Sequence, residues 1–194
     1  MLTLPPCGSS TLYPAKFNES GLLVSHLRAT GTGRVLAAAD ESGEPVCLTL
    51  RQLVRAPPRW NGVDAVLVVE NPSVVALAAD RFGARLPPII CTNGQPRAAT
   101  IVLLRSLAAA GVQLRHHGDF DWGGLAIGNV LQRRLPVEAW QFDRDAYLCA
   151  GAAHPHAAVL TGPTTPASWD SGLTDAMKHA GRRIEEELVA ARPA

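Results

Sequence analysis

Aromatic residues are scarce in this sequence, because Phe, Trp and Tyr together make up only 5% of its 194 residues. A core must therefore be aliphatic, and the 47% of hydrophobic residues are enough to build one folded domain. Net charge is also lacking, since 18 basic and 17 acidic residues leave a formal charge of +1. The composition excludes a highly charged disordered chain, and it carries no overall electrostatic signature of a nucleic-acid-binding protein.

Lysine, paired cysteines and long apolar runs are missing as well. Lys occurs only at positions 16 and 178, so the basic residues are nearly all Arg. Arg is the better phosphate ligand, although a GC-rich genome is the simpler explanation for this bias. The four cysteines are widely spaced with no Cys-x-x-Cys pair, which argues against a zinc site and predicts free thiols in a reducing cytosol. We expect a cytoplasmic protein, because the sequence shows neither a membrane-spanning apolar run nor a signal peptide.

Three segments of different character follow one another along the chain. Pro and Gly interrupt any periodic pattern in residues 1–33, which we predict to be a poorly structured N-terminal arm. Residues 34–60 form a lead-in segment, with a strand expected over residues 46–50. Residues 61–194 form the main domain, in which short apolar runs alternate with longer amphipathic stretches.

The main domain alternates predicted strands with predicted helices. Strands are expected over residues 63–69, 88–91, 112–116 and 137–142, and helices over residues 71–82, 97–110, 125–135 and 171–191. A break of the last helix near Gly181 is an alternative. This alternation is typical of β-α-β crossovers, so we predict an α/β fold with a mostly parallel sheet and helices on both faces.

Acidic residues follow two of the predicted strands. Glu70 ends the first strand, and Asp119 and Asp121 follow the third with one residue between them, so both Asp carboxylates can point to one side. The carboxyl ends of parallel strands meet at the sheet edge where α/β proteins bind ligands. Clustered carboxylates repel one another unless a cation lies between them, and oxygen ligands alone suit Mg²⁺ or Mn²⁺. The alternative is structural, because an Asp after a strand can simply cap the next helix.

Several other residues have both a functional and a structural interpretation. His117 could contact a DNA phosphate, whereas His116 is expected to pack or to form a hydrogen bond. Arg97 could face a phosphate, although a single Arg on a helix is normally solvated. An acidic run near the C-terminus is either a solvated helix face or, through Glu185 or Glu186, a source of a second-metal ligand.

The motifs VLVVENP (66–72) and GDFDWGG (118–124), in this order, resemble a Toprim domain, the catalytic fold shared by topoisomerases, primases and several nucleases. Residues 34–190 further resemble the Toprim-bearing nuclease subunit of Wadjet-type (JetD-like) plasmid-defence systems. The segments that carry this second resemblance include EPVCLTLRQL, CTNGQPRAATIVLLRSLAAAG, LTGPTTPASWDSGL and RIEEEL.

The resemblance implies a Toprim-like, Rossmann-like catalytic domain and Mg²⁺- or Mn²⁺-dependent cleavage of DNA. Asp119 and Asp121 would hold the metal ion, with Glu70 as general acid/base or further ligand. Hydrolysis is favoured over attack by a tyrosine, because Tyr13 and Tyr147 are the only tyrosines and neither lies in a recognisable nucleophile motif. The implied partners are DNA and the SMC-like subunits of a defence complex, with a homodimer as a further assembly and no membrane association.

One departure from the family pattern leaves a second hypothesis open. Members of that family carry an additional N-terminal region before the part matched by residues 34–60, so we expect this chain to be truncated or a minimal version. The alternative function is a non-catalytic interaction domain that binds metal or DNA and depends on partner subunits. A nucleotide-binding enzyme is disfavoured, because Glu-Asn-Pro follows the first strand in place of a glycine-rich phosphate loop.

Overall fold

The computed structural model describes residues 22–25, 29–30, 36, 39 and 44–190. Most of the predicted N-terminal arm lies outside these residues. Two short strands fall within its bounds, β1 (Leu22–Ser25) and β2 (Ala29–Thr30).

Over residues 65–139 the remaining strands and helices alternate as the sequence pattern predicts, and helices alone follow over residues 144–190. The strands are β3 (Val46–Leu48), β4 (Arg59–Trp60), β5 (Ala65–Val69), β6 (Ile89–Cys91), β7 (Gln113–His116) and β8 (Val137–Ala139). The helices are α2 (Leu50–Arg55), α3 (Pro72–Phe82), the 3₁₀ turn η1 (Gly83–Arg85), α4 (Ala98–Ala109), α5 (Trp122–Arg134), α6 (Arg144–Ala153), α7 (Ser171–Ala180) and α8 (Glu186–Ala190). Among the described residues, no helix is long and apolar enough to span a membrane.

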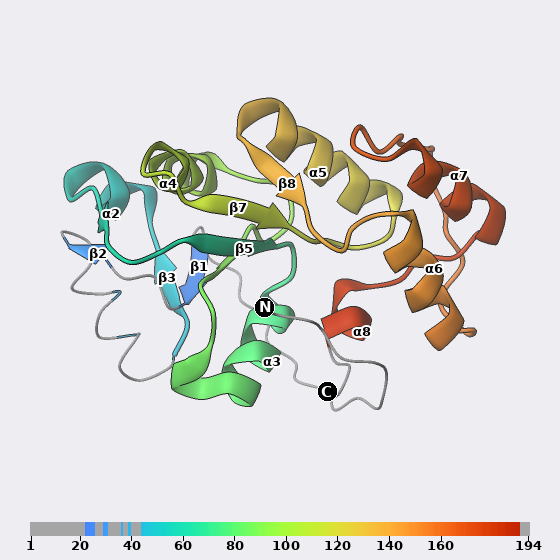
Figure 1. Ribbon diagram of the computed structural model, residues 1–194, viewed down its shortest axis with the longest axis horizontal. Helices are drawn as coiled ribbons and strands as arrows, with labels where there is room; N and C mark the ends of the chain where they lie inside the picture. Colours follow the sequence, from blue (N-terminus) through green and yellow to red (C-terminus); the bar gives the residue numbers. More distant parts are fainter. Residues whose placement is uncertain (1–21, 26–28, 31–35, 37–38, 40–43, 191–194) are drawn as a thin grey trace.

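Six strands form one sheet in the order β3-β1-β6-β5-β7-β8 (Figure 1). Strands β6, β5, β7 and β8 run parallel, which confirms the predicted α/β fold and is consistent with a Rossmann-like or Toprim-like arrangement. Strand β1 pairs antiparallel with both β6 and β3. The sequence does not indicate β1, because its short apolar run is flanked by residues without a clear period.

Helices cover both faces of the sheet (Figure 1). Val66 and Val68 of β5 point to the face covered by α4 and α5, whereas Val69 points to the opposite face with Val74 and Val75 of α3. The helix after β5 and the helix after β7 therefore lie on opposite faces of two neighbouring strands. The carboxyl ends of β5 and β7 thus form the topological switch point, where open α/β sheets bind their ligands.

Helix α5 begins at Trp122, earlier than the predicted start at residue 125. Asp121 caps this helix, because its Oδ1 accepts a hydrogen bond from the backbone N–H of Gly124 at 2.8 Å. The acidic loop is therefore shorter than expected, and Asp121 lies directly at the positive end of a helix.

The alternative of a broken C-terminal helix is confirmed. Gly181 adopts a left-handed conformation with φ of 62° and ends α7. The chain then runs beside the loop that follows β7, where the backbone N–H of Phe120 donates to the carbonyl of Ile184 at 2.9 Å. This return of the chain brings α8 to the edge of the sheet that carries Glu70 and Asp119.

Helix α6 is a further element that the sequence analysis does not predict, because the stretch from residue 143 to Pro166 reads as an irregular connection. Asp143 caps the helix through a hydrogen bond from the backbone N–H of Ala146 at 2.8 Å. Tyr147 packs in a second core with Phe120, Phe142 and Ile184. This core fixes the loop that carries the two aspartates, because Phe120 lies between them in the sequence.

Candidate functional site

The candidate site lies where β5 and β7 end. These strands are parallel neighbours in the sheet, so Glu70 after β5 and the Asp119–Asp121 loop after β7 emerge at the same edge. The C-terminal segment joins them, because the backbone N–H of Glu186 donates to Asp119 Oδ1 at 2.7 Å. We call Glu70, Asp119, Asp121 and Glu187 the acid cluster.

Within the acid cluster, Glu70 is a largely buried residue whose carboxyl pKa is strongly raised. Burial is the main cause that raises its pKa to about 7, and the negative charges of Asp119 and Asp121 raise it further. Its Oε2 atom is buried and has no hydrogen-bond partner among the described residues. The carboxyl group therefore exchanges its proton near neutral pH, which is what a general acid or base requires.

The two aspartates that follow β7 are each oriented by a backbone amide. Burial raises the pKa of Asp119 to about 6, and the bond from Glu186 N–H opposes this shift. Asp121 accepts the capping bond from Gly124. The structural alternative is thus confirmed for Asp121, but the cap uses only Oδ1, and the charge of Asp121 still acts on Glu70 and Asp119.

Glu186 is turned into the protein. Its side chain is fully buried, with 0% exposure, and Oε2 accepts hydrogen bonds from the backbone N–H groups of Glu70 and Asn71, both at 3.0 Å. These amides belong to the turn between β5 and α3. The sequence predicts Glu186 as a second-metal ligand. In the structure, its Oε2 atom holds the turn between β5 and α3.

Glu187 is the residue of the acidic run that faces the cluster, and the sequence reasoning missed it. It accepts a hydrogen bond from Asn71 Nδ2, and its charge helps to raise the pKa of Glu70 and of Asp119. Glu185, in contrast, is exposed and pairs with Arg183. No sequence signal separates these adjacent glutamates, because α8 is too short to show a period.

The two histidines that end β7 are both buried, with 2% exposure for His116 and 4% for His117. His116 forms the expected hydrogen bond, between Nδ1 and the carbonyl of Val68 at 3.0 Å. His117 Nδ1 lies 3.3 Å from the carbonyl of Trp140, and burial lowers the pKa of His117 to about 4. The structure therefore does not place His117 on a surface that DNA could reach.

Arg97 lies at the protein surface, whereas His117 is buried. It is exposed and precedes α4 in the connection that follows β6. Because β6 lies beside β5, Arg97 follows a strand that ends at the same edge as the acid cluster. Its contact with DNA stays a prediction.

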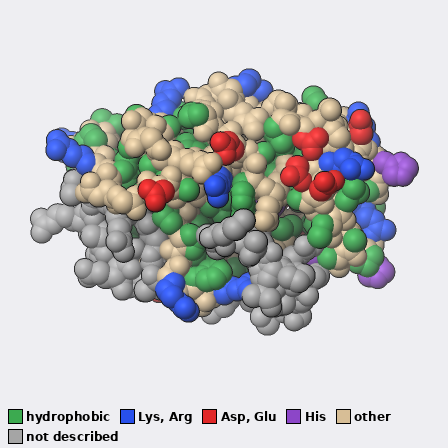
Figure 2. Space-filling model, in the orientation of Figure 1, with side chains coloured by type: hydrophobic (Ala, Val, Ile, Leu, Met, Phe, Trp, Pro, Cys, Tyr) green, Lys and Arg blue, Asp and Glu red, His purple; other side chains and the backbone are tan. Residues whose placement is uncertain are grey.

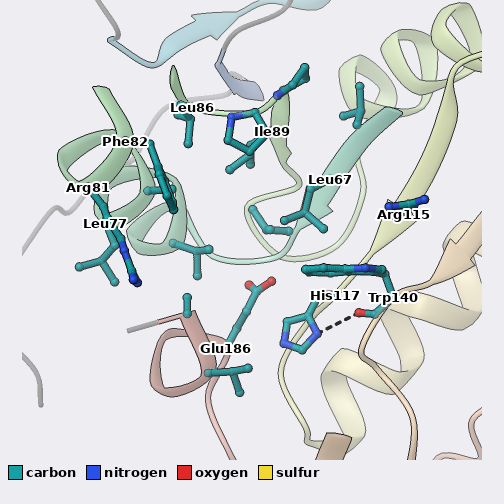
Figure 3. Close-up of a pocket in the computed structure, with 18 of the residues that line it drawn as sticks. Leu67, Leu77, Arg81, Phe82, Leu86, Ile89, Arg115, His117, Trp140 and Glu186 are labelled. Carbon is teal, nitrogen blue, oxygen red and sulfur yellow. Dashed lines mark hydrogen bonds between the residues drawn. The ribbon is translucent and has the colours of Figure 1, made fainter. Parts of the chain in front are cut away.

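A cavity of about 160 Å³ lies beside the acid cluster, between α3, α8 and the sheet (Figure 3). Its walls are mostly apolar and include Leu67, Phe82 and Ile89. Glu186 and His117 also line it, but each is tied to the backbone by a hydrogen bond. The second polar atoms of these two side chains, Glu186 Oε1 and His117 Nε2, are buried without a hydrogen-bond partner among the described residues.

A family model described as "Protein of unknown function C-terminus (DUF2399)" matches residues 46–192, well over half of the chain. This chain belongs to the DUF2399 family. No curated protein gives a significant match. The region matched to DUF2399 contains the whole acid cluster, so the site belongs to the part of the chain that defines the family.

The donor atoms of this DUF2399 site suit a hard divalent cation, because the acid cluster offers only carboxylate oxygens. Glu70 Oε2 and Glu187 Oε2 are buried without a hydrogen-bond partner in the described part of the chain, so each oxygen has a lone pair free for a ligand. As they stand, no three His, Cys, Asp or Glu side chains of the described residues are arranged to hold a metal ion. Side-chain rotation within the cluster would therefore accompany metal binding.

Gly124 sets the path of the DUF2399 acidic loop. A Cβ atom at this position would lie 2.1 Å from the backbone oxygen of Asp119, which no real contact allows. We expect Gly124→Ala to lower the free energy of unfolding by about 2–4 kcal/mol, because the loop must move away from the start of α5. Urea denaturation measures this loss. Gly151→Ala is the control, since its Cβ would meet only Ile184 Cδ1 at 3.8 Å, and equal stability of the two variants would contradict the expected clash.

Proposed function

We propose that this DUF2399 protein hydrolyses DNA phosphodiester bonds with Mg²⁺ or Mn²⁺ held by Glu70, Asp119 and Asp121. The observation that carries the proposal is the meeting of acids from two neighbouring parallel strands at the topological switch point, with the pKa of Glu70 raised to about 7. The resemblance of VLVVENP and GDFDWGG to Toprim nucleases supplies the substrate class. The JetD-like resemblance adds the SMC-like subunits of a plasmid-defence complex as partners.

A bound metal ion would polarise the scissile phosphate and lower the pKa of the attacking water. Asp119 and Asp121 would hold that ion, and the backbone N–H groups of Glu186 and Gly124 orient their carboxylates. Glu70 would be the further ligand of that ion, because its Oε2 atom is buried without a hydrogen-bond partner among the described residues. The exposed Gly123 leaves room for a phosphate backbone next to Asp121, and Arg97 is the cation that would contact DNA at this edge.

Cleavage of supercoiled plasmid by the purified chain tests this function. In Mg²⁺ or Mn²⁺ we expect nicked and linear products that EDTA suppresses. Asp119→Asn should lower the cleavage rate by at least about 10³-fold, because the variant loses a charge that holds the metal ion. Asp80→Asn, which changes an exposed Asp on α3, is the matched control and should cleave like the wild type. Equal cleavage by Asp119→Asn would contradict the assignment.

The second candidate is a non-catalytic interaction domain that needs partner subunits. The observation that favours it is the net charge of +1, which lacks the overall basic character of a nucleic-acid-binding protein. Calorimetry with Mg²⁺ and cleavage assays with partner subunits present separate the two candidates. Metal binding without cleavage under both conditions supports the interaction domain.

A further inference from the structure

The cavity beside the acid cluster has an apolar body and one polar end. Its apolar end lies at Ala65 and Leu86, near the amino ends of β5 and β6. Its other end lies at the carboxyl ends of the strands, where Glu186 and His117 line it. The volume of about 160 Å³ is close to that of an engineered cavity that holds one benzene molecule. The cavity therefore fits a ligand whose apolar body is about one ring in size.

Two aromatic side chains form part of the cavity wall. Phe82 ends α3 and Trp140 follows β8, and the two lie on opposite sides of the cavity (Figure 3). Leu67 and Ile89 line the cavity from the sheet. Because aromatic side chains pack favourably against the face or edge of another ring, these walls favour an aromatic ligand over a branched aliphatic one.

Glu186 contributes a hydrogen-bond acceptor to the polar end. Its Oε2 atom already accepts from the backbone N–H groups of Glu70 and Asn71, whereas Oε1 is buried without a partner among the described residues. The carboxyl group points into the cavity in Figure 3. Buried polar atoms in folded proteins are nearly always paired, so Oε1 is the atom of this side chain that is left for a ligand.

His117 contributes a second acceptor. Its Nδ1 lies 3.3 Å from the carbonyl oxygen of Trp140, and a carbonyl only accepts, so Nδ1 carries the hydrogen and Nε2 is an acceptor. Nε2 is buried and has no partner in the described part of the chain. The ring is held in place by edge-on contacts with Phe120 and Phe142. Both unpaired atoms at this end of the cavity therefore require a donor.

We propose that the cavity binds a small neutral molecule with one aromatic ring and an NH₂ group. The ring lies between Phe82 and Trp140, and the NH₂ group lies at Glu186 Oε1 and His117 Nε2. An NH₂ group has two hydrogens to donate and so matches two acceptors, whereas a hydroxyl group has one and a methyl group has none. This site does not depend on the nuclease function, although Glu186 also holds the turn that carries Glu70.

Aniline and toluene test the site, because the two molecules have nearly the same shape and differ in an NH₂ and a methyl group. We expect aniline to bind the purified chain about tenfold or more tightly than toluene, since only aniline pairs the two acceptors. Aniline should also shift the indole N–H resonance of Trp140, which is assigned by its loss in Trp140→Phe. Absence of aniline binding, equal or tighter binding of toluene, or an unshifted Trp140 resonance overturns the proposal.

Glu186→Gln separates the hydrogen bonds from the apolar walls. The Gln oxygen can still accept from the two backbone amides, which leaves an NH₂ donor facing the cavity in place of an acceptor. We expect this variant to bind aniline about tenfold or more weakly than the wild type and to bind toluene equally well. A folded Glu186→Gln variant that keeps the wild-type preference for aniline contradicts the proposed polar end.

Ala78→Leu tests the position of the ligand without changing either acceptor. Ala78 lines the cavity from α3, so the larger side chain fills part of it, and both ligands should bind about tenfold or more weakly. Ala98→Leu is the matched control, because Ala98 is exposed at the start of α4 and should leave both affinities unchanged. Wild-type affinity for aniline in Ala78→Leu would place the ligand elsewhere and overturn the proposal.

Discussion

Glu70→Gln is expected to stabilise the metal-free protein at pH 8 while removing its response to Mg²⁺. Burial and neighbouring charges raise the pKa of Glu70 from 4.5 to about 7. The stability that goes with this raised pKa is fully present below pH 4.5 and is lost as the pH rises through 7. Gln imitates the protonated form at every pH, so the variant should lie within about 1 kcal/mol of the wild type at pH 5 and exceed it by about 3 kcal/mol at pH 8.

Urea denaturation in EDTA at pH 5 and pH 8 measures this difference. The buried His116 and His117, whose pKa values are lowered to about 4, are present in both proteins, so their own pH dependence cancels. Glu138→Gln changes an exposed glutamate and is the matched control. With Mg²⁺ at one thousand times its Kd the order at pH 8 should reverse, because the bound ion adds about 4.1 kcal/mol to the wild type only. A constant difference at both pH values would contradict this assignment.

Glu186→Ala is expected to cause one of the largest losses of stability in the described part of the chain. The truncation leaves the backbone N–H groups of Glu70 and Asn71 without the carboxylate that accepts from both, and it empties a fully buried position. Two buried donors without acceptors, together with the cavity, should cost about 3–5 kcal/mol.

Glu186→Gln is the informative partner of that variant, because its amide oxygen can still accept from the two backbone amides. We expect Glu186→Gln to stay within about 1 kcal/mol of the wild type and to bind Mg²⁺ normally. Melting temperatures and Mg²⁺ calorimetry of both variants provide the test. A stable Glu186→Gln variant that no longer binds Mg²⁺ would make Glu186 a metal ligand and contradict its role in holding the turn.

Local patterns were sufficient to predict most of the fold. The apolar run that became β5 and the Asn-Pro start and Gly83 end of α3 carry their own signals, so these boundaries agree with the sequence analysis. Strand β1 was missed because its pairing partners, β3 and β6, come much later in the chain. Helix α6 was missed because its residues were read together with the Gly- and Pro-containing connection that follows them, although Asp143 is an ordinary helix cap.

The sequence predicts the part of the acid cluster that neighbouring parallel strands bring together. It does not predict the part that the C-terminal segment after Gly181 contributes. Glu70 and Asp119 meet because neighbouring parallel strands end at one edge. The choice between Glu186 and Glu187 depends on how the segment after Gly181 lies beside Phe120, which is a tertiary contact without a local signal. The same holds for the buried position of His117, whose ring packs against Phe120 and Phe142.

Not all of the acidic residues contribute to the surface charge of the protein. In the space-filling view, acidic and basic side chains are interspersed over the visible face (Figure 2). Glu70 and Glu186 are withdrawn from the surface, and burial raises the pKa of each. A nucleic-acid-binding function in this family would therefore depend on a local metal charge rather than on an overall basic surface.

Crystals soaked in Mn²⁺ test the central claim most directly, because the anomalous signal locates the ion without reference to activity. We predict a peak at pH 8 within about 2.2 Å of carboxylate oxygens from Glu70 and from at least one of Asp119 and Asp121. The peak should disappear in crystals of Asp119→Asn. A wild-type crystal that shows no peak at the acid cluster, or a peak that persists unchanged in Asp119→Asn, would contradict the proposed metal site.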